Sequence, residues 1–116
     1  MRAVYHRQEN PWGRTTVIVM AGGKTLAMVT VTEDERDAAI LHDLMVHPSK
    51  RRLGIGDALL AEASEEAKRM GAKTLRLSVA PDSWMEGWYE RDGFHLVGTN
   101  AYEGHAADIM EKSILD

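Results

Sequence analysis

The segment from Val46 to Leu60 joins an apolar run to an amphipathic one through a basic loop that contains two glycines. Gly54 and Gly56 carry no Cβ, so a ligand can lie directly against their main chain. The helix expected after them offers unpaired N–H groups and the positive end of its dipole. With basic side chains at positions 50–52 beside it, this loop is suited to bind a phosphate or a pyrophosphate.

Two common phosphate-binding motifs do not fit the loop. A nucleotide-hydrolase loop requires lysine and then serine or threonine after its last glycine, whereas Asp57 follows Gly56. A dinucleotide fingerprint requires a third glycine where Leu59 stands. The segment is therefore either another class of phosphate loop or an ordinary connection between a strand and a helix.

Alternation and turn residues predict an antiparallel meander before this loop. A charged turn at 33–37 and the Gly22–Gly23 pair separate strands, and Asn10–Gly13 breaks the first one. The expected strands are Ala3–Tyr5, Thr15–Met20, Lys24–Thr32 and Ala38–Val46.

The second half of the chain predicts two helices and three further strands. Apolar residues recur at helical spacing over 54–70, and Gly71 is typical of the left-handed residue that ends a helix. The strand Thr74–Val79 must run parallel to the one ending at Val46, because a crossover through a helix of this length requires it. A second helix from 81–83 to about Arg91, closed by Gly93, and a hairpin of Phe94–Gly98 with Ala106–Ser113 complete the chain.

These elements predict a single α/β domain of the α+β kind, spanning residues 1–116. Its sheet is mixed, mostly antiparallel, with one parallel pair in the middle and two main helices. The basic loop lies at the carboxyl end of the first parallel strand, where open α/β sheets bind ligands. The loop is thus expected at the position in the fold where a ligand site is most common.

Composition excludes several classes of protein. The formal charge of −4 disfavours a nucleic-acid binder. The chain has no cysteine, so disulfides, thiolate metal sites and a cysteine nucleophile are excluded. The first residues lack the apolar core of a signal peptide, and the longest apolar run, Val17–Ala21, is too short to span a membrane. We expect a cytoplasmic protein that binds neither nucleic acid nor membranes.

Two ordered motifs resemble those of the GNAT superfamily of N-acetyltransferases. Arg51-x-x-Gly54-x-Gly56 is similar to the family's (Arg/Gln)-x-x-Gly-x-(Gly/Ala) loop, and Trp88–Phe94 is similar to its Leu-Tyr-Glu-x-x-Gly-Phe. The resemblance covers residues 38–98 well and the flanking residues loosely. It implies that acetyl-coenzyme A is the co-substrate, with its pyrophosphate on the loop and its pantetheine arm between two splayed parallel strands.

The resemblance also implies a set of residues that bind the co-substrate. Main-chain groups of the strand before the loop would pair with pantetheine, and the amide of Val46 would stabilise the oxyanion. Asp82 stands where the family commonly has asparagine; its plainer role is to cap the second helix, as that of Asp57 is to begin the first. The full set is Leu44, Met45, Val46, Arg51, Arg52, Leu53, Gly54, Ile55, Gly56, Asp57, Asp82, Ser83 and Tyr89.

Acetyl transfer to an amine requires a proton acceptor and a proton donor. Tyr89 matches the family's tyrosine that protonates the departing thiolate, although a half-buried aromatic on a helix is the alternative. His42 lies where several members carry a glutamate or histidine base, and an imidazole has a suitable pKa. Asp43 is adjacent to it but should point to the opposite face of the strand. A histidine packed in the sheet and a base that is simply water remain alternatives, and Glu33 and Glu35 are lesser candidates.

Other side chains have plainer interpretations. His42, Asp43 and His47 could suggest a metal, but positions 42 and 47 project to opposite faces of a regular strand, so no metal is expected. Trp84 and Trp88 share one helix face and favour packing in the core or between subunits over acceptor binding. The acidic turn at 33–37 would suit a cationic amine, but such runs are usually solvated turns.

The chain departs from the family before its second strand, where most members have two helices that wall the acceptor site. Their absence leaves either an open cleft suited to a protein or peptide amine, or a site that a second subunit completes in a homodimer. We expect an N-acetyltransferase that moves the acetyl group of acetyl-coenzyme A to a primary amine by direct attack in a ternary complex. The acceptor would be a small molecule, a protein lysine or an N-terminus. The alternative is a non-catalytic module that binds acyl-coenzyme A and regulates a partner.

Overall fold

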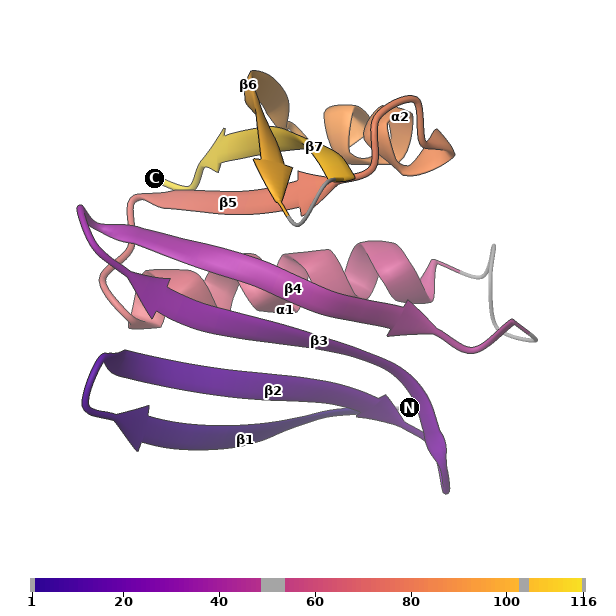
Figure 1. Cartoon of the computed structure of the whole chain (residues 1–116). Helices are drawn as coiled ribbons and strands as arrows, with labels where there is room; N and C mark the ends of the chain where they lie inside the picture. Colours follow the sequence, from indigo (N-terminus) through magenta and orange to yellow (C-terminus); the bar gives the residue numbers. More distant parts are fainter. Residues whose placement is uncertain (1, 49–53, 103–104, 116) are drawn as a thin grey trace.

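Seven strands form one sheet in the order β1-β2-β3-β4-β5-β7-β6 (Figure 1). The computed structural model describes residues 2–48, 54–102 and 105–115. The strands are β1 (Arg2–Asn10), β2 (Gly13–Ala21), β3 (Thr25–Asp34), β4 (Ala38–Val46), β5 (Thr74–Val79), β6 (His95–Tyr102) and β7 (His105–Ser113). Two helices, α1 (Ile55–Arg69) and α2 (Trp84–Arg91), complete the described part of the chain. The predicted mixed sheet with one parallel pair and two helices is confirmed.

Helix α1 packs on one face of β2, β3 and β4 (Figure 1). Alternate residues of β2, namely Thr16, Ile18 and Met20, are buried, as a strand with one covered face requires. The core side of α1 carries Leu59, Leu60 and Ala63, all fully buried. This layer holds the beginning of α1 in a fixed place beside the end of β4.

Strands β4 and β5 are parallel but pair over a short stretch only. Their register joins Ala38–Ile40 to Thr74–Arg76 and goes no further, whereas β5 pairs with β7 along its whole length. The remaining six residues of β4 therefore lie next to a strand that has diverged from them. The predicted parallel crossover is confirmed, and the sheet opens between β4 and β5 toward the start of α1.

A β-bulge in β4 changes which side chains share a face. Thr30 pairs with His42 and Met28 with Met45, so Asp43 and Leu44 lie opposite a single residue of β3. Asp43 has a φ of 55°, in the left-handed region. Before the bulge the odd-numbered side chains of β4 face the core, and after it the even-numbered ones do. Leu44 and Val46 accordingly pack against the same core as Leu41.

The bulge corrects two expectations that assumed a regular strand. Asp43 does not simply point away from His42, since the two side chains are hydrogen-bonded. The expectation that His42 and His47 lie on opposite faces is also wrong, because the extra residue moves every later side chain to the other face of the sheet. Among the described residues, however, no group of three or more His, Asp or Glu side chains could hold a metal.

Strand β1 is longer than its composition indicates. We predicted Ala3–Tyr5, whereas the strand runs from Arg2 to Asn10 and pairs with β2 along its full length. A two-residue turn, Pro11–Trp12, joins the two strands, so a hairpin stands where the resemblance would place two helices. Neither α1 nor α2 has the length and apolarity to cross a bilayer; this finding covers the described residues only.

The ends of the helices follow the expected chemistry with one correction. Gly71, with a φ of 88°, is the left-handed residue after α1. The cap of α2 is Ser83, whose hydroxyl accepts a hydrogen bond from the amide of Met85. Asp82, the residue expected to cap this helix, instead adopts a left-handed φ of 59° and is exposed.

Candidate functional site

The described part of the basic loop ends in a glycine that begins α1. Gly54 is the N-cap residue with a φ of 78°, and no side chain among the described residues caps the first turn. A Cβ added to Gly54 would meet no described atom within 4 Å, so open space adjoins its main chain. Ile55 is buried and fixes this end of the helix in the core. The predicted ligands Arg51, Arg52 and Leu53 lie outside the described residues.

The second glycine of the motif is in contact with protein. A Cβ at Gly56 would lie 2.9 Å from the Trp88 ring, so only glycine fits under the indole. The Trp88 Nε1–H donates to Asp57 Oδ1 at 2.8 Å. Trp88 therefore ties the start of α1 to α2, and Asp57 has a structural partner. Trp84, by contrast, is 74% exposed, so the two tryptophans do not share one environment.

The edge of β4 presents main-chain groups to the opening in the sheet. The His47 amide donates to the Leu26 carbonyl of β3 at 2.7 Å. Because antiparallel ladders alternate, the main-chain groups of Leu44 and Val46 are directed away from β3, toward the side where β5 has diverged. The same alternation turns those of Met45 toward β3.

Tyr89 is buried on α2 between two other aromatic rings. It is 4% exposed, with the Trp88 ring centroid at 5.0 Å and the Phe94 centroid at 5.6 Å. Burial raises the pKa of the Tyr89 phenol to about 12. The phenol consequently stays protonated throughout the neutral range and can act as a hydrogen-bond donor there.

His42 lies two residues beyond the last pair that joins β4 to β5. Its Nε2 is 2.8 Å from the Thr32 hydroxyl and its Nδ1 is 3.1 Å from Asp43 Oδ2. The ring is 44% exposed, so a substrate or water can reach it. His42 is thus neither packed in the core nor isolated, and it has the partners that a general base requires.

The other candidate bases are less suitable. The Glu33 carboxylate accepts two hydrogen bonds from the Arg14 side chain and one from its amide, and these hold the pKa of Glu33 below its usual value. Glu35 lies in an exposed part of the turn after β3. A carboxylate with a lowered pKa accepts a proton poorly at neutral pH.

The acidic turn at 33–37 is largely neutralised by basic partners. Besides Glu33 with Arg14, the pairs are Asp34 with Arg76 at 3.9 Å and Asp37 with Lys73 at 3.7 Å. The turn therefore carries little unpaired negative charge with which to attract a cationic acceptor.

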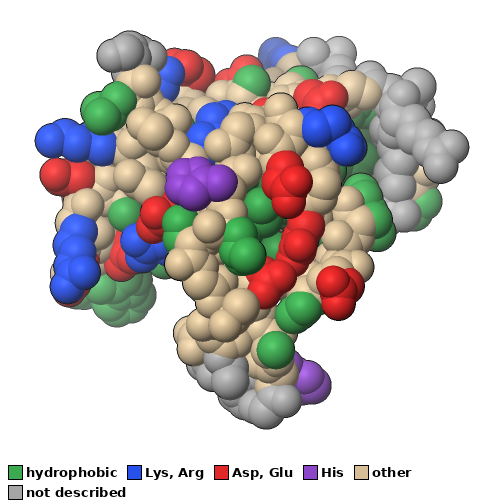
Figure 2. All heavy atoms as spheres, turned by 90° about the horizontal axis from the view of Figure 1, so that it is seen from above, with side chains coloured by type: hydrophobic (Ala, Val, Ile, Leu, Met, Phe, Trp, Pro, Cys, Tyr) green, Lys and Arg blue, Asp and Glu red, His purple; other side chains and the backbone are tan. Residues whose placement is uncertain are grey.

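A second acidic group was not found by sequence reasoning. Acidic side chains gather in the middle of the face shown in Figure 2. The Glu86 carboxyl of α2, one turn before Tyr89, lies against Asp108 of β7, with Asp82 and Glu90 near it. The hydrogen bond to Asp108 and burial raise the pKa of Glu86 to about 7. No local pattern joins these residues, because the contact depends on how α2 packs on β7.

We expect Glu86→Gln to stabilise the protein at alkaline pH and not at acidic pH. Since the pKa of Glu86 is raised from 4.5 to about 7, the folded state holds this proton between those values while the unfolded state releases it. Stability therefore falls as pH rises through that window. The amide has no proton to lose, so the melting temperature of the variant should exceed that of the wild type at pH 8 and equal it at pH 4. Glu65→Gln, which changes an exposed carboxylate of α1, is the control, and an equal shift at both pH values would contradict the assignment.

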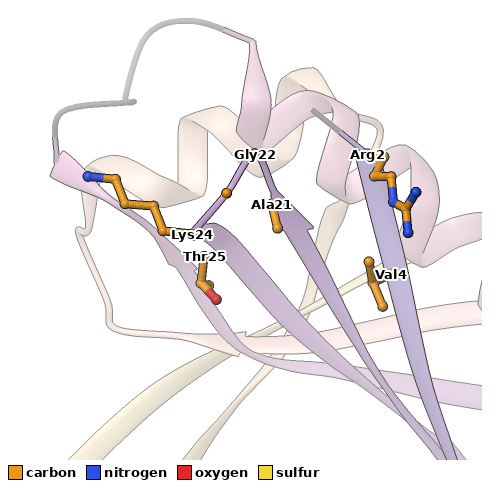
Figure 3. A pocket seen from close by; sticks show the side chains of 7 residues that line it. Arg2, Val4, Ala21, Gly22, Lys24 and Thr25 are labelled. Atoms are coloured by element: carbon orange, nitrogen blue, oxygen red, sulfur yellow. The ribbon is translucent and has the colours of Figure 1, made fainter.

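One hollow lies away from all of these residues. It has a volume of about 610 Å³ and opens beside the turn between β2 and β3, with Lys24 on one side and Arg2 and Val4 of β1 on the other (Figure 3). It contains none of the predicted site residues. The candidate site is therefore the opening between β4 and β5 with the start of α1, His42 and Tyr89 around it.

Comparison with known proteins identifies the family of the chain. The model of the GNAT acetyltransferase domain matches residues 12–96, which is most of the sequence. No curated protein sequence matches the chain.

Solved structures share the fold over nearly the whole chain. An IAA acetyltransferase from Bacillus cereus has a TM-score of 0.75 at 17% identity, with 97% of this chain and 99% of that one covered. An aminoglycoside 6'-N-acetyltransferase complexed with coenzyme A has a TM-score of 0.78 at 17% identity, covering 92% and 76%. The ribosomal-protein-S18-alanine N-acetyltransferase from Escherichia coli has a TM-score of 0.71 at 25% identity, covering 91% and 72%. With the family model and the architecture in agreement, the chain belongs to the GNAT family of acetyltransferase domains.

Proposed function

We propose that the protein transfers the acetyl group of acetyl-coenzyme A to a primary amine by direct attack in a ternary complex. The observation that carries this proposal is the divergence of β4 from β5 after Ile40, beside the start of α1, where Gly54 has no side chain to cap the helix. An extended chain that ends in a pyrophosphate can lie along the edge of β4 and reach the first turn of the helix. A neighbour of the same fold is described as a complex with coenzyme A.

Acetyl-coenzyme A, when bound, supplies a thioester carbonyl. In this proposal the main-chain amides at Gly54 and beyond hold the phosphates, and the edge of β4 orients the arm. As the resemblance to the family implies, the Val46 amide stabilises the oxygen that becomes negative as the amine attacks. The Tyr89 phenol donates a hydrogen bond to the departing sulfur, and His42 accepts the proton that the amine must lose.

Tyr89 and His42 have different roles in proton transfer. A phenol with a pKa of about 12 is a weaker acid than a thiol, whose pKa is about 8.5 in model compounds, so complete transfer from Tyr89 to the thiolate is uphill. Tyr89 therefore stabilises the sulfur by hydrogen bonding and loses its proton only as another replaces it. The amine must instead lose a proton before it attacks, because an amine with a pKa near 10.4 is almost wholly protonated at pH 7.

The acceptor is proposed at the level of its chemistry, a primary amine on a small molecule or a protein. Neighbours of this fold are described as acting on an aminoglycoside and on a ribosomal-protein alanine, so the fold accepts both kinds. The hairpin between β1 and β2 leaves the site without the two walling helices, which favours a large or extended acceptor.

The test is turnover of acetyl-coenzyme A with a panel of amines. Release of free thiol and a mass increase of one acetyl group on a polyamine, a lysine peptide or a peptide N-terminus are expected. Calorimetry with coenzyme A measures binding separately. Binding without turnover on any amine would favour the non-catalytic acyl-coenzyme A module, and absence of both would overturn the proposal.

A further inference from the structure

The two tryptophans of α2 have different surroundings. Trp88 packs against the core, and its indole N–H donates to Asp57. Trp84, the first residue of the helix, is 74% exposed, and its indole N–H has no hydrogen-bond partner among the described residues. Single exposed apolar side chains are common on protein surfaces, so it is the position of Trp84 that matters.

The contact of Trp88 with α1 places Trp84 near the start of that helix. The Trp88 ring lies so close to Gly56, the second residue of α1, that a Cβ there would be 2.9 Å away (Figure 1). Residues four apart in a helix lie on the same face and about 6 Å apart along the axis. The face of α2 that meets the first turn of α1 therefore carries an exposed indole one turn before the contact.

The main chain at Trp84 is held in place from both sides. The Ser83 hydroxyl accepts a hydrogen bond from the Met85 amide at 3.2 Å, and the Ser83 carbonyl accepts one from the Glu86 amide at 3.1 Å. The Met85 side chain packs against the core. A tryptophan has only two side-chain torsions, so an indole on a fixed main chain loses little conformational freedom when a ligand stacks on it.

The ligand proposed for the start of α1 has an aromatic part. With its pyrophosphate on the main chain at Gly54, acetyl-coenzyme A extends in two directions. The pantetheine arm leads to the edge of β4, and on the other side a single ribose separates the pyrophosphate from the adenine. A purine is flat and has two π faces, and stacking of such a base on an aromatic side chain strengthens binding by about tenfold or more.

We propose that Trp84 stacks on the adenine of acetyl-coenzyme A and selects acyl donors that carry this nucleotide. The proposal rests on the proposed acetyl transfer. Acyl groups carried on phosphopantetheine have the same thioester and the same arm, but they lack the purine. Since Trp84 is placed beside the phosphates and not beside the thioester, it strengthens binding equally in the ground state and in the transition state. Its removal should therefore raise KM and leave kcat unchanged.

The first measurement is calorimetry with two ligands, coenzyme A and phosphopantetheine. Trp84→Ala should weaken the binding of coenzyme A about tenfold and leave that of phosphopantetheine unchanged. Alanine favours a helix at least as much as tryptophan does, so the variant keeps α2 intact. Trp84→Phe, which retains an aromatic face, should keep most of the affinity.

Trp12→Ala is the matched control for this variant. Trp12 is 75% exposed but lies in the turn between β1 and β2, so its removal should change neither affinity.

The second measurement is indole fluorescence, which reports the stacking without turnover. Coenzyme A should quench part of the emission of the wild type and of Trp12→Phe, because a stacked purine quenches an indole. That part should be missing in Trp84→Phe.

Kinetics and binding together separate this inference from the proposed function. The KM for acetyl-coenzyme A should rise about tenfold in Trp84→Ala. Wild-type affinity of Trp84→Ala for coenzyme A, or an equal loss for phosphopantetheine, would overturn the stacking and leave the acetyl transfer standing. A rise in the KM for the amine alone would place Trp84 at the acceptor and would also overturn it. Failure of every form to bind coenzyme A would overturn both.

Discussion

Tyr89→Phe is expected to lower kcat about 10²-fold while leaving the affinity for acetyl-coenzyme A nearly unchanged. The variant removes one oxygen and keeps the ring that packs between Trp88 and Phe94. The lost hydrogen bond matters only when negative charge develops on the departing sulfur, so it affects the transition state and not the bound ground state. Steady-state kinetics with a saturating amine, together with calorimetry of coenzyme A binding, measure the two quantities.

The pH dependence of the wild type adds an independent check on Tyr89. A phenol of ordinary pKa, near 10, would begin to lose its proton at moderately alkaline pH and stop donating. Burial raises the pKa of Tyr89 to about 12, so turnover should show no alkaline loss from this group up to pH values near 10.

Tyr5→Phe is the matched control for this variant. The Tyr5 hydroxyl also has a polar partner, Glu62 of α1, but lies on β1 rather than on α2. Its removal should leave kcat unchanged. Equal kcat in Tyr89→Phe and the wild type would remove the tyrosine from the mechanism, and an equal loss in both variants would point to a general effect on the fold.

The parts of the fold that could be predicted are those encoded by local periodicity. The helical spacing from Ile55 to Met70 and the closing glycine gave α1 almost to the residue, because each apolar side chain repeats on one face. The parallel direction of β5 followed from the crossover rule alone. Neither inference needs knowledge of which distant residues touch.

The parts that could not be predicted depend on such contacts. The charged residues of β1 mask its strand pattern, since Arg7 binds Glu66, which lies 59 positions away in the sequence. The bulge at Asp43 leaves no mark in composition. The contact between Gly56 and the Trp88 indole joins residues of two different helices. In each case the partner comes from another element of the sheet or a helix.

Glu66→Gln is expected to destabilise the protein by about 2–3 kcal/mol at neutral pH. The Glu66 side chain is 2% exposed and accepts hydrogen bonds from Arg7 at 2.8 and 2.9 Å, Thr16 at 2.6 Å and Arg69 at 3.0 Å. These partners, of which Arg7 has the largest effect, lower the pKa of Glu66 from 4.5 to about 2. Such a fall corresponds to about 3 kcal/mol, and the lower end of the range allows for both arginines being more than half exposed and regaining water.

The sign of the pH dependence follows from the lowered pKa. The unfolded chain takes up this proton near 4.5 and the folded protein only near 2, so the stabilisation is fully present above 4.5 and is lost as pH falls toward 2. Urea unfolding of the wild type and Glu66→Gln should therefore differ most at pH 7 and converge as the pH approaches 2. Glu65→Gln, which changes the neighbouring and exposed carboxylate, should unfold like the wild type at both pH values.

The position of Glu66 also predicts where the loss should appear. Within the described part of the chain, β1 is an edge strand that pairs with β2 alone. The ion pair of Arg7 with Glu66 joins β1 directly to α1, across the layer that contains the core. Amide hydrogens of β1 should therefore exchange faster in Glu66→Gln, while those of β5 and β7 change little. Uniform acceleration over all strands would show that Glu66 supports the core as a whole, and no acceleration would show that pairing with β2 alone holds the strand in place.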